Sequence, residues 1–384
     1  MTATAPATWF QRFLLPGFAF KAVVIGGGYA TGRELAEFFL PSGPWGGLAG
    51  MLLATLLWSL VAAITFTFAF VFGAFDYRAF FARLLGRGWI LFETAYALFV
   101  ILILAVFGAA AGAIVTALFG WPPLAGTFLL AAGIAGFAAF GNASIERLFK
   151  YVSFMLYGVY GLFLILALTA FKDRIAVGFT LPGPAMSGWV AGGITYASYN
   201  VVGAVAVLPM LRHLTSRRDA IVSGLVAGPL AMAPAIVFFI CMAAFYPQIG
   251  SETLPSDFML RRMGSPAFHL LFQLMIFCAL LESGAGSVHA INERLAAAWH
   301  ARRGRELGPG SRAMIAGVLL VGCMFLADRF GLVALIAKGY RGLALLFLAV
   351  YVLPLFTVGL MRLLRAPVAI ELPATPGPGP DMAP

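Results

Sequence analysis

Long apolar stretches set the strongest constraint on the fold of this 384-residue chain. A helix needs about 20 mainly apolar residues to cross the hydrocarbon core of a bilayer, and the sequence offers ten such stretches. The ninth is short, and residues 330–340 are predicted either to continue it or to form a helical elbow. The predicted spans are 14–40, 46–72, 89–118, 123–141, 151–171, 188–211, 220–245, 267–291, 313–327 and 342–364.

Composition agrees with an all-α polytopic membrane protein made of one membrane domain. Apolar residues make up 62% of the chain and charged residues only 10%, whereas a soluble domain carries about 25% charged residues. The first stretch lacks the short apolar core and cleavage site of a signal peptide, so we expect it to be a retained span. The proline-rich tail, residues 366–384, is predicted to be disordered.

Other classes of protein find little support in the sequence. The cysteines have neither disulfide nor metal-ligand spacing; they are Cys241, Cys278 and Cys323. The chain lacks H-E-x-x-H, paired catalytic aspartates and a serine–lysine motif. We therefore expect no enzyme, no metal site other than a possible Na⁺ site, and no cofactor beyond coupling to Na⁺ or H⁺.

The basic residues predict the orientation of the spans. With ten spans both termini share one side, and loops on that side hold sixteen positive residues against five on the other. The positive-inside rule then places both termini in the cytoplasm, and we expect the bacterial inner membrane. The same asymmetry accounts for most of the formal charge of +10, which argues against nucleic acid as a partner. The expected partners are the lipid bilayer and a small-molecule substrate, with the chain a monomer or homodimer.

Two of the spans carry glycine-rich polar runs. The first contains Gly26-Gly27-Gly28-Tyr29-Ala30-Thr31-Gly32, and the sixth contains Gly192-Gly193-Ile194-Thr195-Tyr196-Ala197-Ser198-Tyr199-Asn200. Glycine costs roughly 0.5–1 kcal/mol relative to alanine inside a helix, so both runs predict discontinuous helices. Spans one and six are equivalent if the chain is two repeats of five spans, about 13–171 and 187–365. Because five is odd, such repeats must be inverted.

Interrupted helices at corresponding positions indicate a binding site. They free backbone groups at mid-membrane, and these groups must face protein or a watery cavity. The alternative is that the glycines only let helices pack closely. The residues predicted to contact a substrate are Gly26, Gly27, Gly28, Tyr29, Ala30, Thr31, Gly32, Arg33, Thr195, Tyr196, Ser198, Tyr199 and Asn200.

The first run also carries a resemblance. GGGYATGRELAEFF resembles the G-A-G-F-A-S-G-x-E signature of the YkvI-like family of bacterial membrane proteins, a branch of the amino acid–polyamine–organocation superfamily. ITYASYNVVGAVAVLP, LLESGAGSVHAINERL and GLVALIAKGYRGLALLFLAVYVLPL agree with it, so the resemblance covers about residues 10–365. It implies an inverted five-plus-five fold of the LeuT type with alternating access around spans one, three, six and eight. The chain departs from the signature at Gly27 and Arg33.

Charged residues inside the spans are candidates for ion coupling. Lys21 and Glu282 lie at comparable depth, and their spans are neighbours in the LeuT-type fold that the resemblance implies. We therefore expect them to pair, either as a coupling site or as a fixed structural ion pair. The resemblance implies a further possibility. Hydroxyls of Ser283 and Ser287 would hold Na⁺ together with carbonyls of the first break, those of Ile25 and Gly28; in proton-coupled relatives Lys21 or Glu282 would titrate.

Three charged residues follow the first run and are candidates for gating. Arg33 and Glu37 are spaced i,i+4 and are predicted to pair on one helix face. Glu34 is then left to line the outer vestibule or to meet another span. Glu93 is predicted to lie in the first turn of span three, where a carboxylate suits a helix N-terminus.

The sequence therefore predicts a secondary active transporter of a small organic solute, such as an amino acid or related carboxylate. The alternative is a membrane sensor or accessory protein of the same fold that binds a solute without net transport.

Overall fold

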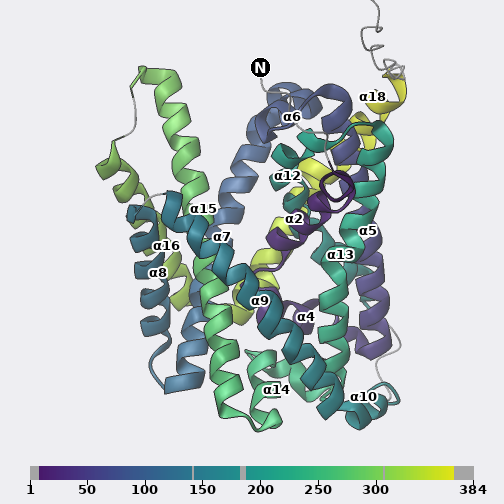
Figure 1. The fold of residues 1–384 in the computed structure, drawn as a ribbon, viewed down its shortest axis with the longest axis vertical. Coiled ribbons are helices and arrows are strands. Elements are labelled where there is room, and N and C mark those ends of the chain that lie inside the picture. Colours follow the sequence, from purple (N-terminus) through teal and green to yellow (C-terminus); the bar gives the residue numbers. More distant parts are fainter. Residues whose placement is uncertain (1–7, 141, 182–186, 306–307, 367–384) are drawn as a thin grey trace, which may run out of the picture.

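A computed structural model describes residues 8–140, 142–181, 187–305 and 308–366 of the chain. These ranges form helices and contain no strand, and each predicted span corresponds to one helix or to a run of helices (Figure 1). The first span is α2 (Leu15–Val24), α3 (Gly27–Thr31) and α4 (Arg33–Phe38), and the sixth is α11 (Trp189–Asn200) with α12 (Val202–Ala206). The other spans are α5 (Gly43–Phe72), α7 (Trp89–Phe119), α8 (Pro123–Phe140), α9 (Asn142–Ala170), α13 (Arg217–Ala243), α15 (Pro266–Arg303), α16 (Pro309–Ala334) and the run η5 (Leu335–Tyr340), α17 (Arg341–Phe347), η6 (Leu348–Val352), η7 (Leu355–Gly359) and α18 (Leu360–Arg365).

Short elements connect the spans at the two ends of the molecule. α1 (Trp9–Phe13), η3 (Leu208–His213), α6 (Tyr77–Leu85) and η2 (Gly86–Gly88) belong to the terminal end, where α18 also lies. η1 (Leu40–Ser42), α10 (Lys172–Gly178), η4 (Gln248–Ser251) and α14 (Pro255–Met263) belong to the opposite end, called here the far end. The first and last described helices, α1 and α18, thus lie at one end, as an even number of crossings requires.

Within the described ranges, five helical segments are long and apolar enough to cross a membrane. They are Arg33–Phe72, Tyr77–Phe119, Arg217–Ala243, Pro266–His300 and Gly310–Arg365. Shorter apolar helices accompany them at Leu15–Val24, Pro123–Phe137 and Gly158–Ala170. The surface also carries large apolar side chains that only lipid would solvate, such as Val318 and Leu345, which are 71% and 70% exposed. The chain is a multi-pass membrane protein.

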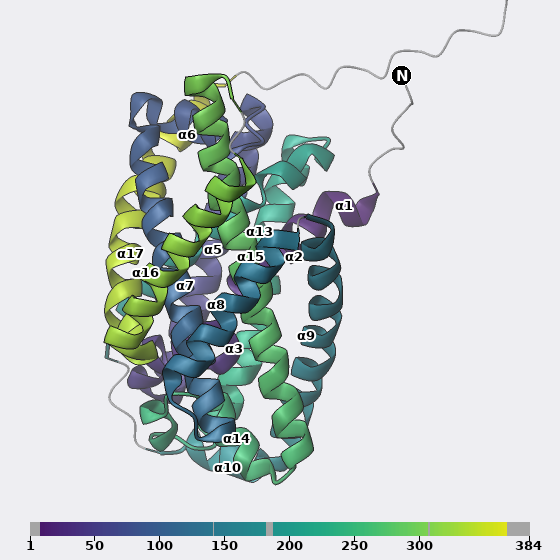
Figure 2. The same cartoon turned by 90° about the vertical axis from the view of Figure 1, so that its left-hand side faces the viewer.

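The helices pack in two groups that lie side by side (Figures 1 and 2). In the first group α5 packs on α11 and α13, and α13 packs on α2. In the second group α7, α8, α15 and α16 pack on one another, and α9 packs on α15. The short helix α3 contacts α7 and α15 of the second group, so the broken first span lies where the groups meet.

The eighth and ninth spans differ in length from the prediction. α15 has 38 residues, about 57 Å at 1.5 Å per residue, and therefore extends beyond a hydrocarbon core of about 30 Å. Part of the predicted loop around Arg294 is thus helical. The ninth span runs well past residue 327, and the chain turns at Gly331, where φ is 70° and ψ is 168°. The predicted elbow is this one residue, because a left-handed φ suits glycine.

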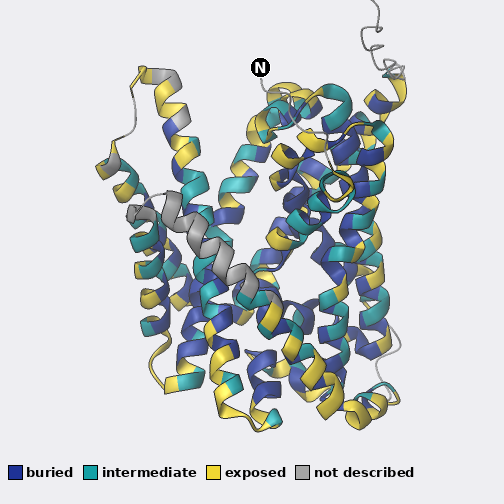
Figure 3. Ribbon diagram, in the orientation of Figure 1, coloured by how far each residue is buried: buried dark blue, intermediate teal, exposed yellow. Residues whose placement is uncertain are grey.

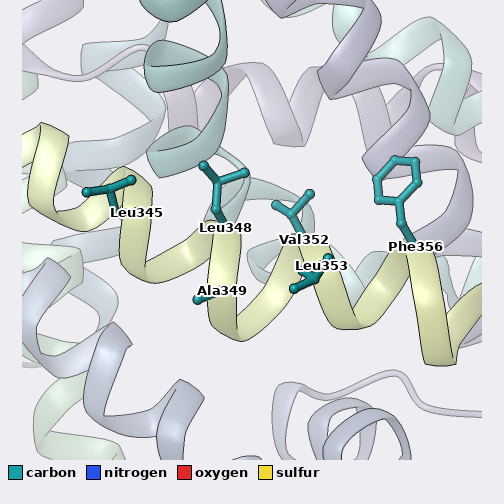
Figure 4. Close-up of a pocket in the computed structure, with 6 residues that line it drawn as sticks. All are labelled: Leu345, Leu348, Ala349, Val352, Leu353 and Phe356. Carbon is teal, nitrogen blue, oxygen red and sulfur yellow. The ribbon is translucent and has the colours of Figure 1, made fainter.

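Buried residues face the contacts between helices, while exposed residues cover the perimeter (Figure 3). A groove on the last span has only apolar side chains in its lining (Figure 4). They are Leu345, Leu348, Ala349, Val352, Leu353 and Phe356. This lining offers no hydrogen bond to a polar solute, so the groove belongs to the lipid-facing surface.

Candidate functional site

The first span is broken twice. α2 ends at Val24, and the backbone passes through Ile25 (φ −75°, ψ 78°) and an extended Gly26 (φ −101°, ψ −172°) before α3 begins. A second break falls at Gly32, whose φ of 79° is left-handed. The predicted discontinuity of span one is confirmed, and the glycine run is its physical cause.

Close packing adds a second reason for glycine in this run. A side chain on Gly28 would overlap the carboxyl group of Glu34, which lies against its Cα. A side chain on Gly32 would overlap the ring of Phe238 from α13. Thus α3 is a single turn held between a buried carboxyl and a neighbouring helix.

The interruption of span six is not where the sequence predicted it. Gly192 and Gly193 lie inside the continuous helix α11, which ends at Asn200. Only Val201 separates α11 from α12, and its φ of −59° and ψ of −19° stay close to helical values. A Cβ on Gly193 would lie 2.6 Å from the carbonyl oxygen of Gly50, and one on Gly192 would overlap that of Phe38. These glycines therefore serve close helix packing, the alternative reading of the run.

Glu34 connects the two spans. Its carboxyl group is buried, the residue being 4% exposed, and its Oε2 accepts a 2.7 Å hydrogen bond from the hydroxyl of Tyr199. The ring of Tyr199 lies 4.4 Å from that of Tyr340 in η5 and 5.7 Å from that of Tyr196. Of the two predicted alternatives, Glu34 therefore meets another span.

Arg33 bonds the far end of the broken span to a neighbouring segment. Its Nη1 donates 2.8 Å hydrogen bonds to the carbonyl oxygens of Gly250 and Glu252, in the segment between α13 and α14. Its Nη2 lies 3.0 Å from Glu37 Oε2, which confirms the predicted i,i+4 pair. Arg341 adds a 3.4 Å contact to Glu37 Oε1. Arg33 is 4% exposed, and these bonds tie α4 to the segment between α13 and α14.

Three of the polar side chains predicted to touch a substrate bind the backbone of their own helix. Ser198 Oγ donates to the Ile194 carbonyl at 2.6 Å and Asn200 Nδ2 to the Tyr196 carbonyl at 3.1 Å. Thr31 Oγ1 donates to the Gly28 carbonyl at 3.1 Å.

The hydroxyls of Tyr29 and Tyr196 behave differently. Tyr29 reaches across to the Ala231 carbonyl of α13 at 3.3 Å. The hydroxyl of Tyr196 is buried without a hydrogen-bond partner among the described residues, and the residue is 0% exposed. An orphaned buried hydroxyl is costly, so Tyr196 is the predicted residue best placed to need a ligand. Thr195 is half-buried beside it.

The predicted ion pair between Lys21 and Glu282 does not form. Among ion pairs between described residues none joins them; the Nζ of Lys21 lies 5.9 Å from the ring of Phe18 on the same helix. The physical reason is packing: α2 packs mainly on α13, whereas Glu282 belongs to α15, which packs on α7, α8 and α9.

The serines predicted to bind Na⁺ lie on α15, which does pack against α3. The hydroxyl of Ser287 donates to the Ser283 carbonyl at 2.8 Å. In the described hydrogen bonds neither serine hydroxyl reaches the carbonyl of Ile25 or Gly28. The sodium site stays a prediction.

Two polar contacts at the terminal end escaped the sequence reasoning. Arg12 donates two 2.8 Å hydrogen bonds to the carboxylate of Asp219, which ties α1 to the start of α13. Only the helix start could have been found from the sequence: Ser216 caps α13 and accepts a hydrogen bond from the Asp219 N–H. Glu93 lies beyond the first turn of α7, contrary to the prediction, and pairs with Arg294 at 3.3 Å.

Comparisons with known proteins place the fold. No family model matches the chain, and no curated protein matches it. Solved structures of similar architecture include MhsT in complex with L-phenylalanine, 17% identical over 94% of this chain and 98% of that chain with a TM-score of 0.54. A Na⁺-coupled sialic acid symporter is 13% identical over 92% and 81% with a TM-score of 0.57. A manganese transporter from Eremococcus coleocola is 17% identical over 92% and 81% with a TM-score of 0.57.

These structures are transporters of the LeuT fold, and they share it with this chain over nearly its whole length. The chain is an all-α polytopic membrane protein of the LeuT fold.

Proposed function

We propose that the protein is a secondary active transporter of a small organic solute, with its binding site at the broken first span and the adjoining face of α11. The observation that carries the proposal is the break at Ile25 and Gly26, where helical hydrogen bonding stops. The buried Tyr196 hydroxyl supports it, because α11 packs on α4 of the same span. Irregular backbone at membrane depth is tolerated only where protein or an aqueous cavity satisfies it. In transporters such breaks form the substrate site.

The chemistry around the break favours an organic substrate with polar groups, such as an amino acid or related carboxylate. The Tyr196 hydroxyl is orphaned, and an aromatic ring with a free hydroxyl offers both apolar contact and a directional hydrogen bond. The described residues hold no group of three His, Cys, Asp or Glu side chains able to bind a metal ion.

Arg33 and Glu37 form the outer gate in this proposal. The terminal end is the cytoplasmic one by the positive-inside rule, so the bonds of Arg33 to Gly250 and Glu252 close the external side. Alternating access then requires these bonds to break when the external side opens.

Several finer assignments belong to the same proposal. They are membership of the YkvI-like family, inverted repeats at about 13–171 and 187–365, coupling to Na⁺ or H⁺, and location in a bacterial inner membrane. The chain acts as a monomer or homodimer in this proposal.

Counterflow in proteoliposomes tests transport against solute binding alone. Amino acids and small carboxylates that stabilise the purified protein are loaded unlabelled inside the vesicles, and labelled solute is added outside. A transporter accumulates label transiently, and accumulation disappears without internal solute. Saturable binding without counterflow, in vesicles where the protein is folded, would overturn the proposal in favour of a sensor or accessory protein.

A further inference from the structure

The carboxyl group of Glu34 is buried in the site without a cationic partner among the described residues. It is buried at the meeting point of α3, α4 and α11. Tyr199 occupies its Oε2, and Oε1 lies against Gly28. No described lysine, arginine or histidine forms an ion pair with it, because its neighbour Arg33 is bound to Glu37 and to the two backbone carbonyls at the far end.

The elements packed against α4 bring no compensating charge. The titratable groups close to the Glu34 carboxyl are phenols. They belong to Tyr29 on α3, Tyr196 and Tyr199 on α11, and Tyr340 on η5. Lys338 of η5 is exposed. η1 and η4 carry no titratable side chain, and Glu37 on α4 is held by Arg33 and Arg341.

A carboxylate in such surroundings is expensive. The effective penalty for burying an unpaired ion is several kcal/mol, and neutralisation removes most of it. A Na⁺ ion would need several oxygen ligands around Oε1, whereas Gly28 packs so closely against this oxygen that a Cβ on it would overlap the carboxyl group. A proton needs only Oε1 itself. The packing of the site therefore favours a proton as the neutralising cation.

We propose that Glu34 binds the proton that drives transport, one H⁺ per carboxyl, while α4 is packed on α11. This rests on the proposed transport function and replaces Lys21 and Glu282 as the candidate titrating groups. When the external gate opens, α4 moves from α11, the bond to Tyr199 breaks, and water reaches the carboxyl group. In that state the proton exchanges with the external side only. Its release to the cytoplasmic side requires the opposite state, with the far end closed and the terminal end open, and access to one side at a time is what coupling requires.

Infrared difference spectroscopy of the purified full-length protein tests the proposal without a substrate. Spectra are compared between about pH 5 and about pH 9, a range that covers buried carboxyl groups. We expect a protonated-carboxyl C=O band that is absent in Glu34→Gln and present in the control Glu282→Gln. In Tyr199→Phe the band should shift in frequency, because the carboxyl loses its hydrogen bond; this variant decides the matter if Glu34→Gln does not fold.

Three results would overturn the proposal. They are a wild-type protein without the band over the whole range, a band that persists in folded Glu34→Gln, and a band that disappears on adding Na⁺ but not K⁺. None of these results depends on whether a transported solute has been found. A failure of counterflow with the band assigned to Glu34 would instead count against transport while leaving the proton site in place.

Discussion

The hydroxyl of Tyr199 donates a 2.7 Å hydrogen bond to Glu34, a residue 165 positions away in the sequence. The bond joins α4 of the broken first span to α11 of the sixth, and both partners are buried. The broken span is therefore fixed to its neighbour through a polar contact that a movement of either helix must break.

Close packing of α11 predicts a stability effect at Gly193. In Gly193→Ala the new Cβ would lie 2.6 Å from a backbone oxygen of Gly50, and backbone cannot move aside cheaply. Overpacking costs typically 1–3 kcal/mol (about 2 kcal/mol), so thermal unfolding in detergent should occur at a clearly lower temperature. The matched control is Gly317→Ala, where nothing lies within 4 Å and a gain of about 0.5–1 kcal/mol is expected. Equal unfolding temperatures for both variants would contradict the packing argument.

Loss of Arg33 should loosen the far end. Arg33→Gln removes the two bonds to Gly250 and Glu252, and we expect a loss of about 1–3 kcal/mol because those carbonyls lose their donor. Hydrogen exchange measured by mass spectrometry should become faster in peptides covering α3 and α4. Arg341→Gln is the control, since this side chain is 63% exposed and an exposed pair contributes about 0–1 kcal/mol. Unchanged exchange in Arg33→Gln would show that these bonds do not close the gate.

Tyr196→Phe separates a ligand contact from a structural one. Removing a buried hydroxyl that lacks a partner should leave the free protein as stable or up to about 1 kcal/mol more stable. The stabilisation by a bound solute should fall, because the solute loses a hydrogen bond. A drop in the stability of the free protein, with solute binding intact, would be the contrary result in a melting experiment with and without solute.

The contact between Arg12 and Asp219 should hold the first helix to the bundle. Asp219 has a side-chain exposure of 2% and also accepts hydrogen bonds from the N–H and hydroxyl of Thr215. Asp219→Ala removes the acceptor of all these hydrogen bonds, whereas Arg12→Ala removes only one of the donors, so Asp219→Ala should cost more stability than Arg12→Ala. Limited proteolysis should cut near α1 sooner in Arg12→Ala than in the wild type. Identical cleavage rates would mean that other contacts hold α1.

The sequence predicted the fold well because apolar length and charge asymmetry are local properties. Each predicted span matches a helix or a run of helices, and the break at Gly26 lies within the predicted run. The ninth span was underestimated because Asp328 and Arg329 interrupt the apolar pattern, although the helix continues to the turn at Gly331.

The site was harder to predict because identical residues serve different purposes. Gly26 breaks a helix, whereas Gly192 lets a helix approach Phe38, and only the position of the neighbouring backbone separates the two cases. The i,i+4 spacing correctly predicted the ion pair of Arg33 and Glu37. The partner of Glu34 is remote in sequence, so no local pattern could indicate it.

The most direct test of a solute site at the first break is a thermal-shift measurement on Gly26 variants. Its backbone is extended, and a Cβ would meet only the ring of Phe107 at 3.5 Å, so Gly26→Ala and Gly26→Leu should fold. Amino acids and small carboxylates are screened with Na⁺ and with K⁺, and Gly317→Leu serves as the control. The account predicts a solute that raises the unfolding temperature of the wild type and the control, less so in Gly26→Ala and not in Gly26→Leu. Full stabilisation of folded Gly26→Leu by the same solute would contradict a site at the break.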